Sequence, residues 1–287
     1  MADLEVLDEA FQAILAPDAE LRLIANGFQF TEGPVWLDDG EYLLFSDIPA
    51  DTIYRWKEGE GHAVWRMPSH NANGNTLDLQ GRLVSCEHGS RRVTRTEKDG
   101  SVTVLAATFG GKRLNSPNDV VVKSDGTLWF TDPPYGIKPE EQEQPACHVF
   151  RLDPGAMEPT PVGEEFRPNG LAFSPDEQFL YVANSDRAEP VVRRFRVTKG
   201  NTLDGGEVLF RIDPGVPDGF RCDAEGRIYC TAGDGVHVLT SEGRLLGKIR
   251  TPQAAANCVF GGPGRKTLFI TAVSSVWAVR LETRGAR

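Results

Sequence analysis

Residues 126–132, Gly126-Thr-Leu-Trp-Phe-Thr-Asp132, show the pattern that decides the fold: a turn residue followed by a short run of apolar and β-branched side chains. The pattern occurs five more times, as Glu41-Tyr-Leu-Leu-Phe-Ser-Asp47, Gly81-Arg-Leu-Val-Ser-Cys-Glu87, Gln178-Phe-Leu-Tyr-Val-Ala-Asn184, Gly226-Arg-Ile-Tyr-Cys-Thr-Ala232 and Lys266-Thr-Leu-Phe-Ile-Thr-Ala272. The six runs begin 40 to 52 residues apart. That interval accommodates four short strands and their turns, which indicates a repeat of small antiparallel sheets.

A second strand precedes each run across a tight turn such as Ser124-Asp125-Gly126. These predicted inner strands are Pro34 to Leu37, Thr76 to Leu79, Val120 to Lys123, Leu171 to Ser174, Phe220 to Asp223 and Val259 to Gly261. Most runs are followed by two more β-rich segments, for example 52–57 and 62–67, or 191–198 and 207–212. Six repeats of four strands, with almost no helical periodicity after residue 18, predict an all-β fold, a six-bladed β-propeller.

The two ends of the chain predict how the ring closes. The last repeat has a third strand, Ser275 to Leu281, but no fourth, whereas Leu21 to Ala25 is strand-like and precedes the first repeat. We therefore expect 21–25 to pair with 275–281 as the outer strand of the sixth blade, which leaves no open sheet edge. Residues 4–15 carry apolar side chains at helical spacing and predict a short N-terminal helix. The expected organisation is a helical extension over 1–18 and one propeller domain over 19–287.

The amino-acid composition and the net charge indicate which kinds of binding partner are disfavoured for this protein. Apolar residues make up 40% of the 287 residues and charged residues 25%, as in globular proteins. The formal net charge of -10 disfavours binding to nucleic acid or to an anionic membrane surface. The sequence shows neither a long apolar span nor a signal-like start, so we expect a cytoplasmic protein. Its five cysteines include no C-x-x-C pair and are expected to be reduced core residues.

One residue position recurs with the repeat and carries a side-chain oxygen in every blade. Counting back eight or nine residues from each run reaches Glu32, Asn73, Asn118, Asn169, Asp218 and Asn257. These residues precede the inner strands, which line the channel of a propeller, so the six side chains should form a ring at one mouth. Asn, Asp and Gly also favour turns before strands, which is the alternative interpretation at any single position.

Converging carboxylates and amides need a partner when they are buried, and a divalent cation would satisfy them. The ring contains oxygen donors without His or Cys, so Ca²⁺ is the expected ion, with Zn²⁺, Mg²⁺ or Mn²⁺ as alternatives. The ends of the adjacent strands should add Asp47, Glu87, Asp132 and Asn184 to the same rim.

Signatures of other chemistry are missing from the sequence. It has no G-x-S-x-G, H-E-x-x-H, P-loop or G-x-G-x-x-G motif, which argues against serine nucleophiles and nucleotide binding. Among the five histidines, only His88 follows a strand at the predicted active rim. The run Arg91-Arg92 is expected to be a solvated strand face.

Five motifs, in order and at matching spacing, resemble the gluconolactonase and regucalcin (senescence marker protein) family of six-bladed propellers. They are Thr31-Glu32-Gly33-Pro34, Ser116-Pro117-Asn118-Asp119-Val120, Asp132-Pro133-Pro134-Tyr135-Gly136, Pro168-Asn169-Gly170-Leu171 and Pro217-Asp218-Gly219. The resemblance covers roughly residues 20 to 281. The family also includes the fluorophosphate-hydrolysing enzymes. It implies a divalent metal held by Glu32, Asn169 and Asp218, with Asn118 completing the shell or holding substrate.

The sequence departs from the animal regucalcins at one substrate-contacting position. Those proteins carry an Arg two residues before the Asn that matches Asn118, whereas this chain has Ser116, with Arg113 and Asn115 nearby. The Ser-Pro-Asn-Asp version resembles the bacterial gluconolactonase branch.

The predicted reaction is metal-assisted hydrolysis of a small sugar lactone to the aldonic acid, by attack of water on a polarised carbonyl. Asp218 is the candidate base, with Asp119 or Asp132 as alternatives. Candidate substrate contacts are Asn73, His88, Asn115, Asp119, Asp132 and Tyr135, and Asn118 is placed in both the catalytic and the metal set. Two other functions stay open at this point: a phosphotriesterase on the same metal site with Asp218 as nucleophile, and a non-enzymatic propeller that binds calcium or a protein partner.

Overall fold

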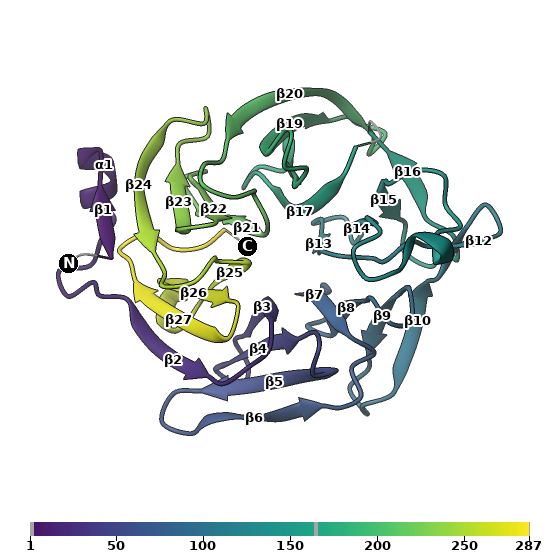
Figure 1. Cartoon of the computed structure of the whole chain (residues 1–287), viewed down its shortest axis with the longest axis horizontal. Helices are drawn as coiled ribbons and strands as arrows, with labels where there is room; N and C mark the ends of the chain where they lie inside the picture. Colours follow the sequence, from purple (N-terminus) through teal and green to yellow (C-terminus); the bar gives the residue numbers. More distant parts are fainter. Residues whose placement is uncertain (1–2, 164–165, 287) are drawn as a thin grey trace.

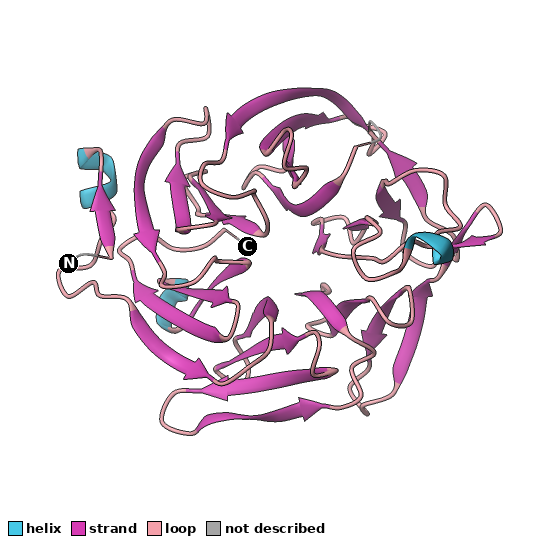
Figure 2. Cartoon of the chain, viewed as in Figure 1, coloured by secondary structure: helices cyan, strands magenta, loops and turns pink. Residues whose placement is uncertain are grey.

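The computed structural model describes residues 3–163 and 166–286, and their strands form six radial sheets around a central axis (Figures 1 and 2). The first three blades are β3(Thr31–Leu37)–β4(Tyr42–Asp47)–β5(Thr52–Lys57)–β6(Gly61–Arg66), β7(Ala72–Leu77)–β8(Leu83–Glu87)–β9(Arg92–Thr96)–β10(Val102–Ala106) and β13(Val120–Val122)–β14(Leu128–Thr131)–β15(Val149–Leu152)–β16(Thr160–Val162). The other three are β17(Pro168–Phe173)–β18(Phe179–Asn184)–β19(Val191–Val197)–β20(Leu203–Arg211), β21(Phe220–Cys222)–β22(Ile228–Ala232)–β23(Gly235–Leu239)–β24(Leu245–Arg250) and β25(Asn257–Gly261)–β26(Thr267–Ala272)–β27(Ser275–Arg280)–β2(Arg22–Asn26). The predicted six-bladed propeller is confirmed.

Three short elements decorate the blades. A two-stranded ribbon, β11(Thr108–Phe109) and β12(Lys112–Arg113), follows the second blade. The 3₁₀ helix η1(Pro139–Glu141) lies in the connection between β14 and β15, and η2(Pro263–Arg265) lies between β25 and β26.

The blades pack face to face, which explains why the strands are apolar on both sides. Along β14, Leu128 and Phe130 pack with side chains of the second blade, whereas Trp129 packs with side chains of the fourth blade. Consecutive residues of one strand point to opposite faces, so a strand between two neighbouring blades must be buried at every position. This is the physical origin of the uninterrupted apolar runs in the repeat.

The ring closes as the missing fourth strand predicts. Strand β2 pairs antiparallel with β27, with Arg22 opposite Ala278 and Asn26 opposite Ser275. Thr31 Oγ1 donates to the carbonyl of Ser275 at 3.1 Å and joins the first blade to the last. Both ends of the chain are therefore needed to complete one sheet.

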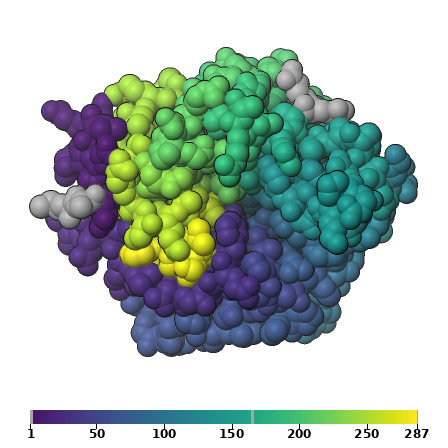
Figure 3. All heavy atoms as spheres, viewed as in Figure 1, coloured from purple at the N-terminus to yellow at the C-terminus, as the bar shows by residue number. Residues whose placement is uncertain are grey.

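The expected helix over 4–15 is wrong in extent. Residues Leu4–Val6 form strand β1, which pairs with β24 as a fifth strand of the fifth blade, and only Glu9–Gln12 form helix α1. The strand has three residues and the helix four, so neither is long enough to show its own period of apolar residues, and the pattern over 4–15 could not separate them. Phe11 is fully buried against the fifth and sixth blades, and the purple N-terminal segment lies on the yellow-green surface of β24 (Figure 3).

The C-terminal tail ends close to the axis of the ring (Figure 1). Glu282 N–H donates to the carbonyl of Ile14 at 2.7 Å, and Ala286 N–H donates to the carbonyl of Cys222 at 3.0 Å. The five cysteines form no disulfide; Cys86, Cys222, Cys230 and Cys258 are buried, as expected, and Cys147 is half-buried. Within the described ranges, no helix has the length and apolar character needed to cross a membrane.

Candidate active site

The six predicted ring residues lie at or just before the start of the inner strands that surround the axis, and glycine follows four of them. At Gly33 a Cβ atom would lie 1.9 Å from the carbonyl oxygen of Asn73, and at Gly219 a Cβ atom would lie 2.0 Å from Cγ of Asn257. Neighbouring blades approach each other so closely at the ring that only glycine fits at these positions. In four blades, a Glu, Asn or Asp followed by Gly therefore identifies the channel mouth in the sequence.

Hydroxyl groups of the second strands hold the ring in register. Ser46 Oγ donates to the carbonyl of Asn73 at 2.9 Å, and Thr131 Oγ1 donates to the carbonyl of Asn169 at 2.7 Å. Thr231 Oγ1 lies 2.9 Å from the carbonyl oxygen of Ala256, the residue before Asn257. Each bond joins one blade to the next, so the backbone that carries the ring is fixed from blade to blade.

Two ring carboxylates, Glu32 and Asp218, influence each other near the axis. Burial together with the negative charge of Asp119 raises the pKa of Glu32 to about 7. Burial, followed by the charges of Glu32 and Asp119, raises the pKa of Asp218 well above its usual range. Carboxylates that destabilise one another's charged form provide a strong reason for a cation to bind between them.

Two ring amides stand next to these carboxylates. The side chain of Asn169 hydrogen-bonds to Asp218 and opposes the rise in its pKa. Asn118 is buried, with 6% of the residue exposed. Its amide oxygen is of the ligand type that a hard cation or a sugar hydroxyl group would bind.

The donor set therefore fits a hard divalent cation. Glu32 and Asp218 supply carboxylate oxygens, and Asn118 and Asn169 can supply amide oxygens, the ligand type that Ca²⁺ prefers. No group of three His, Cys, Asp or Glu side chains capable of holding a metal occurs in the described part of the chain. The candidate set has only two such side chains and depends on the amides for the rest.

Asn73 and His88 form a buried polar pair beside the ring. Asn73 Nδ2 and His88 Nε2 lie 3.2 Å apart, and Oδ1 of Asn73 has no partner among the described residues. Burial lowers the pKa of His88 to about 4, so the imidazole is neutral near pH 7. The pair offers a free acceptor and an uncharged ring to a neutral polar ligand.

Asp119 is a ring neighbour of a different kind, because it occupies the position that glycine holds in four other blades. Its Oδ1 accepts the N–H of Val120 at 2.9 Å. Its Oδ2 is buried without a hydrogen bond among the described residues and lies 3.8 Å from Nη1 of Arg221. Burial raises its pKa, and the charge of Arg221 opposes that rise.

Asp132 is engaged in holding a loop. Its carboxylate accepts the N–H groups of Asn115 and Ser116 at 2.7 and 2.8 Å, and it is fully buried. Burial raises its pKa to about 7 even though these bonds oppose the rise. Asn115 in turn donates to the carbonyls of Asp132 and Ala146, while its Oδ1 has no described partner.

The other residues expected at the rim, at the ends of the second strands, also accept hydrogen bonds from the protein. Asp47 accepts the N–H groups of Gln29 and Phe30, and Glu87 bonds to Thr94, Ser90 and Arg92. Asn184 Nδ2 donates to the carbonyl of Glu189 at 3.1 Å, and its Oδ1 accepts the N–H of Asp186 at 3.3 Å. The side-chain oxygens of Asp47, Glu87 and Asn184 therefore already accept hydrogen bonds from the protein.

Tyr135 and Arg167 stand together near Asp218. The guanidinium carbon of Arg167 lies 5.3 Å from the centre of the Tyr135 ring, a cation–π contact. Burial raises the pKa of Tyr135 to about 12, with Arg167 opposing that rise and Asp218 adding to it. Gly136 N–H donates to Ser116 Oγ at 3.0 Å, which ties this loop to the one that carries Asn118.

The expectation that Arg91 lies on a solvated strand face is wrong, because its side chain is buried. It is 5% exposed, and its Nε donates to the carbonyls of Leu114 and Asn115 at 2.7 and 3.0 Å. Its Nη1 donates to the carbonyl of Glu141 at 2.9 Å. Arg91 therefore joins the two loops beside the ring, a role without any sequence signal because its partners are backbone carbonyls far along the chain.

Comparison with known proteins agrees with this architecture. Residues 30–274 match the family model described as the SMP-30/Gluconolactonase/LRE-like region. The chain is 35% identical to the gluconolactonase of Zymomonas mobilis, over 95% of this chain and 84% of that protein. The chain belongs to the SMP-30/gluconolactonase family.

A solved structure and a more distant sequence relative also match the chain. A gluconolactonase from Xanthomonas campestris superposes with a TM-score of 0.92 at 37% identity, covering 97% of this chain and 94% of that one. Regucalcin from Xenopus laevis is 24% identical, over 87% of this chain and 85% of that protein. The resemblance drawn from the motifs is confirmed, as is a gluconolactonase-like lactone hydrolase at the level of enzyme class.

Proposed function

We propose that the chain hydrolyses a small sugar lactone to its aldonic acid at the ring mouth, in dependence on a divalent cation, with Ca²⁺ as the first candidate. The observation that carries the proposal is the convergence of Glu32 and Asp218, whose charged forms destabilise each other, with the amides of Asn118 and Asn169. Glu32, Asn169 and Asp218 would hold the ion, and Asn118 would complete its shell or hold substrate. When bound, the ion would polarise the lactone carbonyl and stabilise the negative charge that develops on its oxygen.

Side chains of the protein would remove the proton from the attacking water. Asp218, a carboxylate of the ring, is the proposed base for the proton that water gives up. Water adds to the carbonyl carbon, the ring C–O bond breaks, and a proton ends on the released hydroxyl group. Asp132 supports this assignment indirectly, since both its oxygens already accept backbone N–H groups.

Substrate hydroxyl groups would be bound by neutral polar side chains. Asn73 Oδ1 and Asn115 Oδ1 are buried acceptors without described partners. His88, uncharged near pH 7, and Tyr135 would contribute to the same wall. A site of this kind suits a polar, uncharged sugar lactone.

The experiment combines metal analysis with acid release. Purified protein is assayed on aldono-1,5- and aldono-1,4-lactones and on an organophosphate ester, before and after chelation and with Ca²⁺, Zn²⁺, Mg²⁺ or Mn²⁺ added back. Lactone turnover that chelation abolishes and one of these ions restores is the expected result. Asp218→Asn should lose that turnover, whereas Asp39→Asn, a change at an exposed turn, should not.

Two results would contradict the proposal. Full lactone turnover in excess chelator would exclude the cation, and turnover of the organophosphate ester without turnover of any lactone would favour a phosphotriesterase on the same residues.

A further inference from the structure

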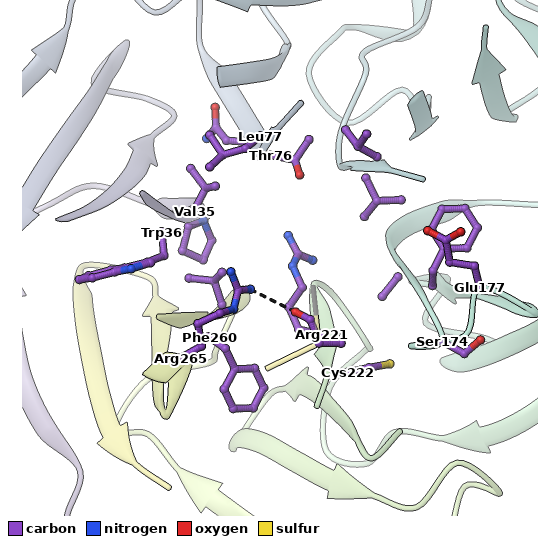
Figure 4. A pocket seen from close by; sticks show the side chains of 18 of the residues that line it. Val35, Trp36, Thr76, Leu77, Ser174, Glu177, Arg221, Cys222, Phe260 and Arg265 are labelled. Atoms are coloured by element: carbon purple, nitrogen blue, oxygen red, sulfur yellow. Dashed lines mark hydrogen bonds between the residues drawn. The ribbon is translucent and has the colours of Figure 1, made fainter. Parts of the chain in front are cut away.

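A cavity of about 310 Å³ lies at the opposite end of the channel from the ring. It is lined by the later residues of the inner strands, and two cationic side chains, Arg221 and Arg265, stand in it (Figure 4). Arg265 belongs to the rim, where Nη2 donates to the carbonyl of Ala286 at 3.1 Å and Nη1 lies 3.8 Å from Asp38. Arg221 stands at the centre and has no such rim contact in the described chain.

Strand alternation aims Arg221 along the channel. Its neighbours on β21, Phe220 and Cys222, are buried between blades, so the side chain between them faces the axis. Its Nη1 donates to the carbonyl of Phe220 at 2.7 Å and lies 3.8 Å from Oδ2 of Asp119. Asp119 belongs to the third blade and Arg221 to the fifth, so the contact crosses the channel from behind the ring.

Arg221 is a cation placed directly behind the ring carboxylates. Glu32 and Asp119 are buried and Asp218 is half-buried. Nη1 of Arg221 lies 3.8 Å from Oδ2 of Asp119, and its charge acts on Glu32 as well. Arg221 therefore offsets part of the negative charge of the ring, and a divalent cation would offset more of it.

We propose that Arg221 is a fixed counter-charge of the metal site, which acts through its contact with Asp119, the neighbour of Asn118, and offsets part of the negative charge that binds a divalent ion. The inference rests on the proposed metal dependence. Without the arginine, three carboxylates would face each other in the metal-free protein, which would be less stable. The same excess negative charge would bind a divalent cation more tightly, because the repulsion between two cations in one channel is gone.

The test measures binding of Ca²⁺ itself, by calorimetry on metal-stripped protein at pH 8. Arg221→Met and Arg221→Gln should each lower the Kd for Ca²⁺, on the order of ten-fold at low salt. Arg221→Lys keeps the charge and should bind Ca²⁺ like the parent protein. Arg265→Met removes a cation from the same cavity without touching the ring, and its Kd for Ca²⁺ should be unchanged.

Thermal unfolding supplies a second measurement. The metal-free forms of Arg221→Met and Arg221→Gln should melt below the parent, and Ca²⁺ should raise their Tm by more than it raises that of the parent. Unchanged or weaker Ca²⁺ binding in both neutral variants would overturn the counter-charge assignment while leaving the metal site intact. A parent protein that binds none of the four divalent ions would overturn the metal site and this inference together.

Discussion

Asn257 Nδ2 lies 3.1 Å from Oε2 of Glu32, so the last blade of the ring orients a candidate metal ligand of the first. The amide is itself held, because its Oδ1 accepts the N–H of Cys258 at 2.9 Å. Glu32 Oε2 also accepts the N–H of Gly33 at 2.6 Å. The carboxylate of Glu32 therefore takes this orientation only when the last blade packs beside the first and closes the propeller.

Asn257→Ala should weaken metal binding without unfolding the protein. The change removes one of the two hydrogen bonds that orient Glu32 and leaves only the N–H of Gly33, a loss that typically costs about ten-fold or more in metal affinity. Calorimetric titration with Ca²⁺ checks this, with Asn26→Ala on an exposed strand position as the matched control. Equal affinity in Asn257→Ala and the parent would show that the orientation of Glu32 does not depend on Asn257.

Asp218→Asn and Asn118→Ala should separate the kinetic constants of lactone hydrolysis. Loss of the proposed base and of a metal charge should lower kcat by about 100-fold or more, since both act mainly in the transition state. Loss of an amide that only holds substrate should instead raise KM with a smaller change in kcat. A rise in KM alone for Asp218→Asn would remove it as the base.

His88 should make the stability of the protein depend on pH. Burial lowers the pKa of this imidazole to about 4 in the folded state, below the 6.5 of an unfolded chain. The folded state thus binds a proton less readily, and the stability contribution, fully present above pH 6.5, is lost as pH falls toward 4. Between pH 7 and pH 5 the loss should be about 2 kcal/mol. Urea unfolding of His88→Gln, compared with the parent at both pH values, isolates this contribution; an identical pH dependence in the two proteins would contradict it.

Arg91→Met should impair substrate binding more than it impairs folding. The change leaves the carbonyls of Leu114, Asn115 and Glu141 without their donor and frees the two loops beside the ring. The free energy of unfolding should fall by about 1–3 kcal/mol, and KM for the lactone should rise. Arg92→Met, which removes a contact to Glu87 instead, serves as the control, and a KM that rises equally in both variants would argue against a specific role for Arg91.

Phe11→Ala should destabilise the propeller although the residue precedes every blade. Its ring is fully buried against the fifth and sixth blades, so truncation should cost about 3 kcal/mol. Leu7→Ala, at a 53% exposed position, should cost far less. Chemical unfolding of both variants provides the comparison, and a parent-like Phe11→Ala would show that the N-terminal segment is dispensable.

The repeat and the ring could be predicted from sequence because each rests on a local rule applied six times. Alternating side chains mark strands, and oxygen-bearing residues before the inner strands mark one end of the channel. The outer strand Arg22–Asn26 followed from counting, since a sheet lacking a strand at one end of the chain must take it from the other.

Tertiary structure decided what each polar side chain is used for. Asp132 and Asp218 both occur in Asp-containing motifs near a strand end, yet the carboxylate of Asp132 accepts the N–H groups of Asn115 and Ser116, while that of Asp218 hydrogen-bonds to the side chain of Asn169. Arg91 is buried and Arg221 reaches across the channel to Asp119, because hydrogen-bond partners and the approach of charges depend on distances between blades. Sequence determines which residues begin the inner strands, but burial and long-range electrostatics arise only when six blades close around one axis.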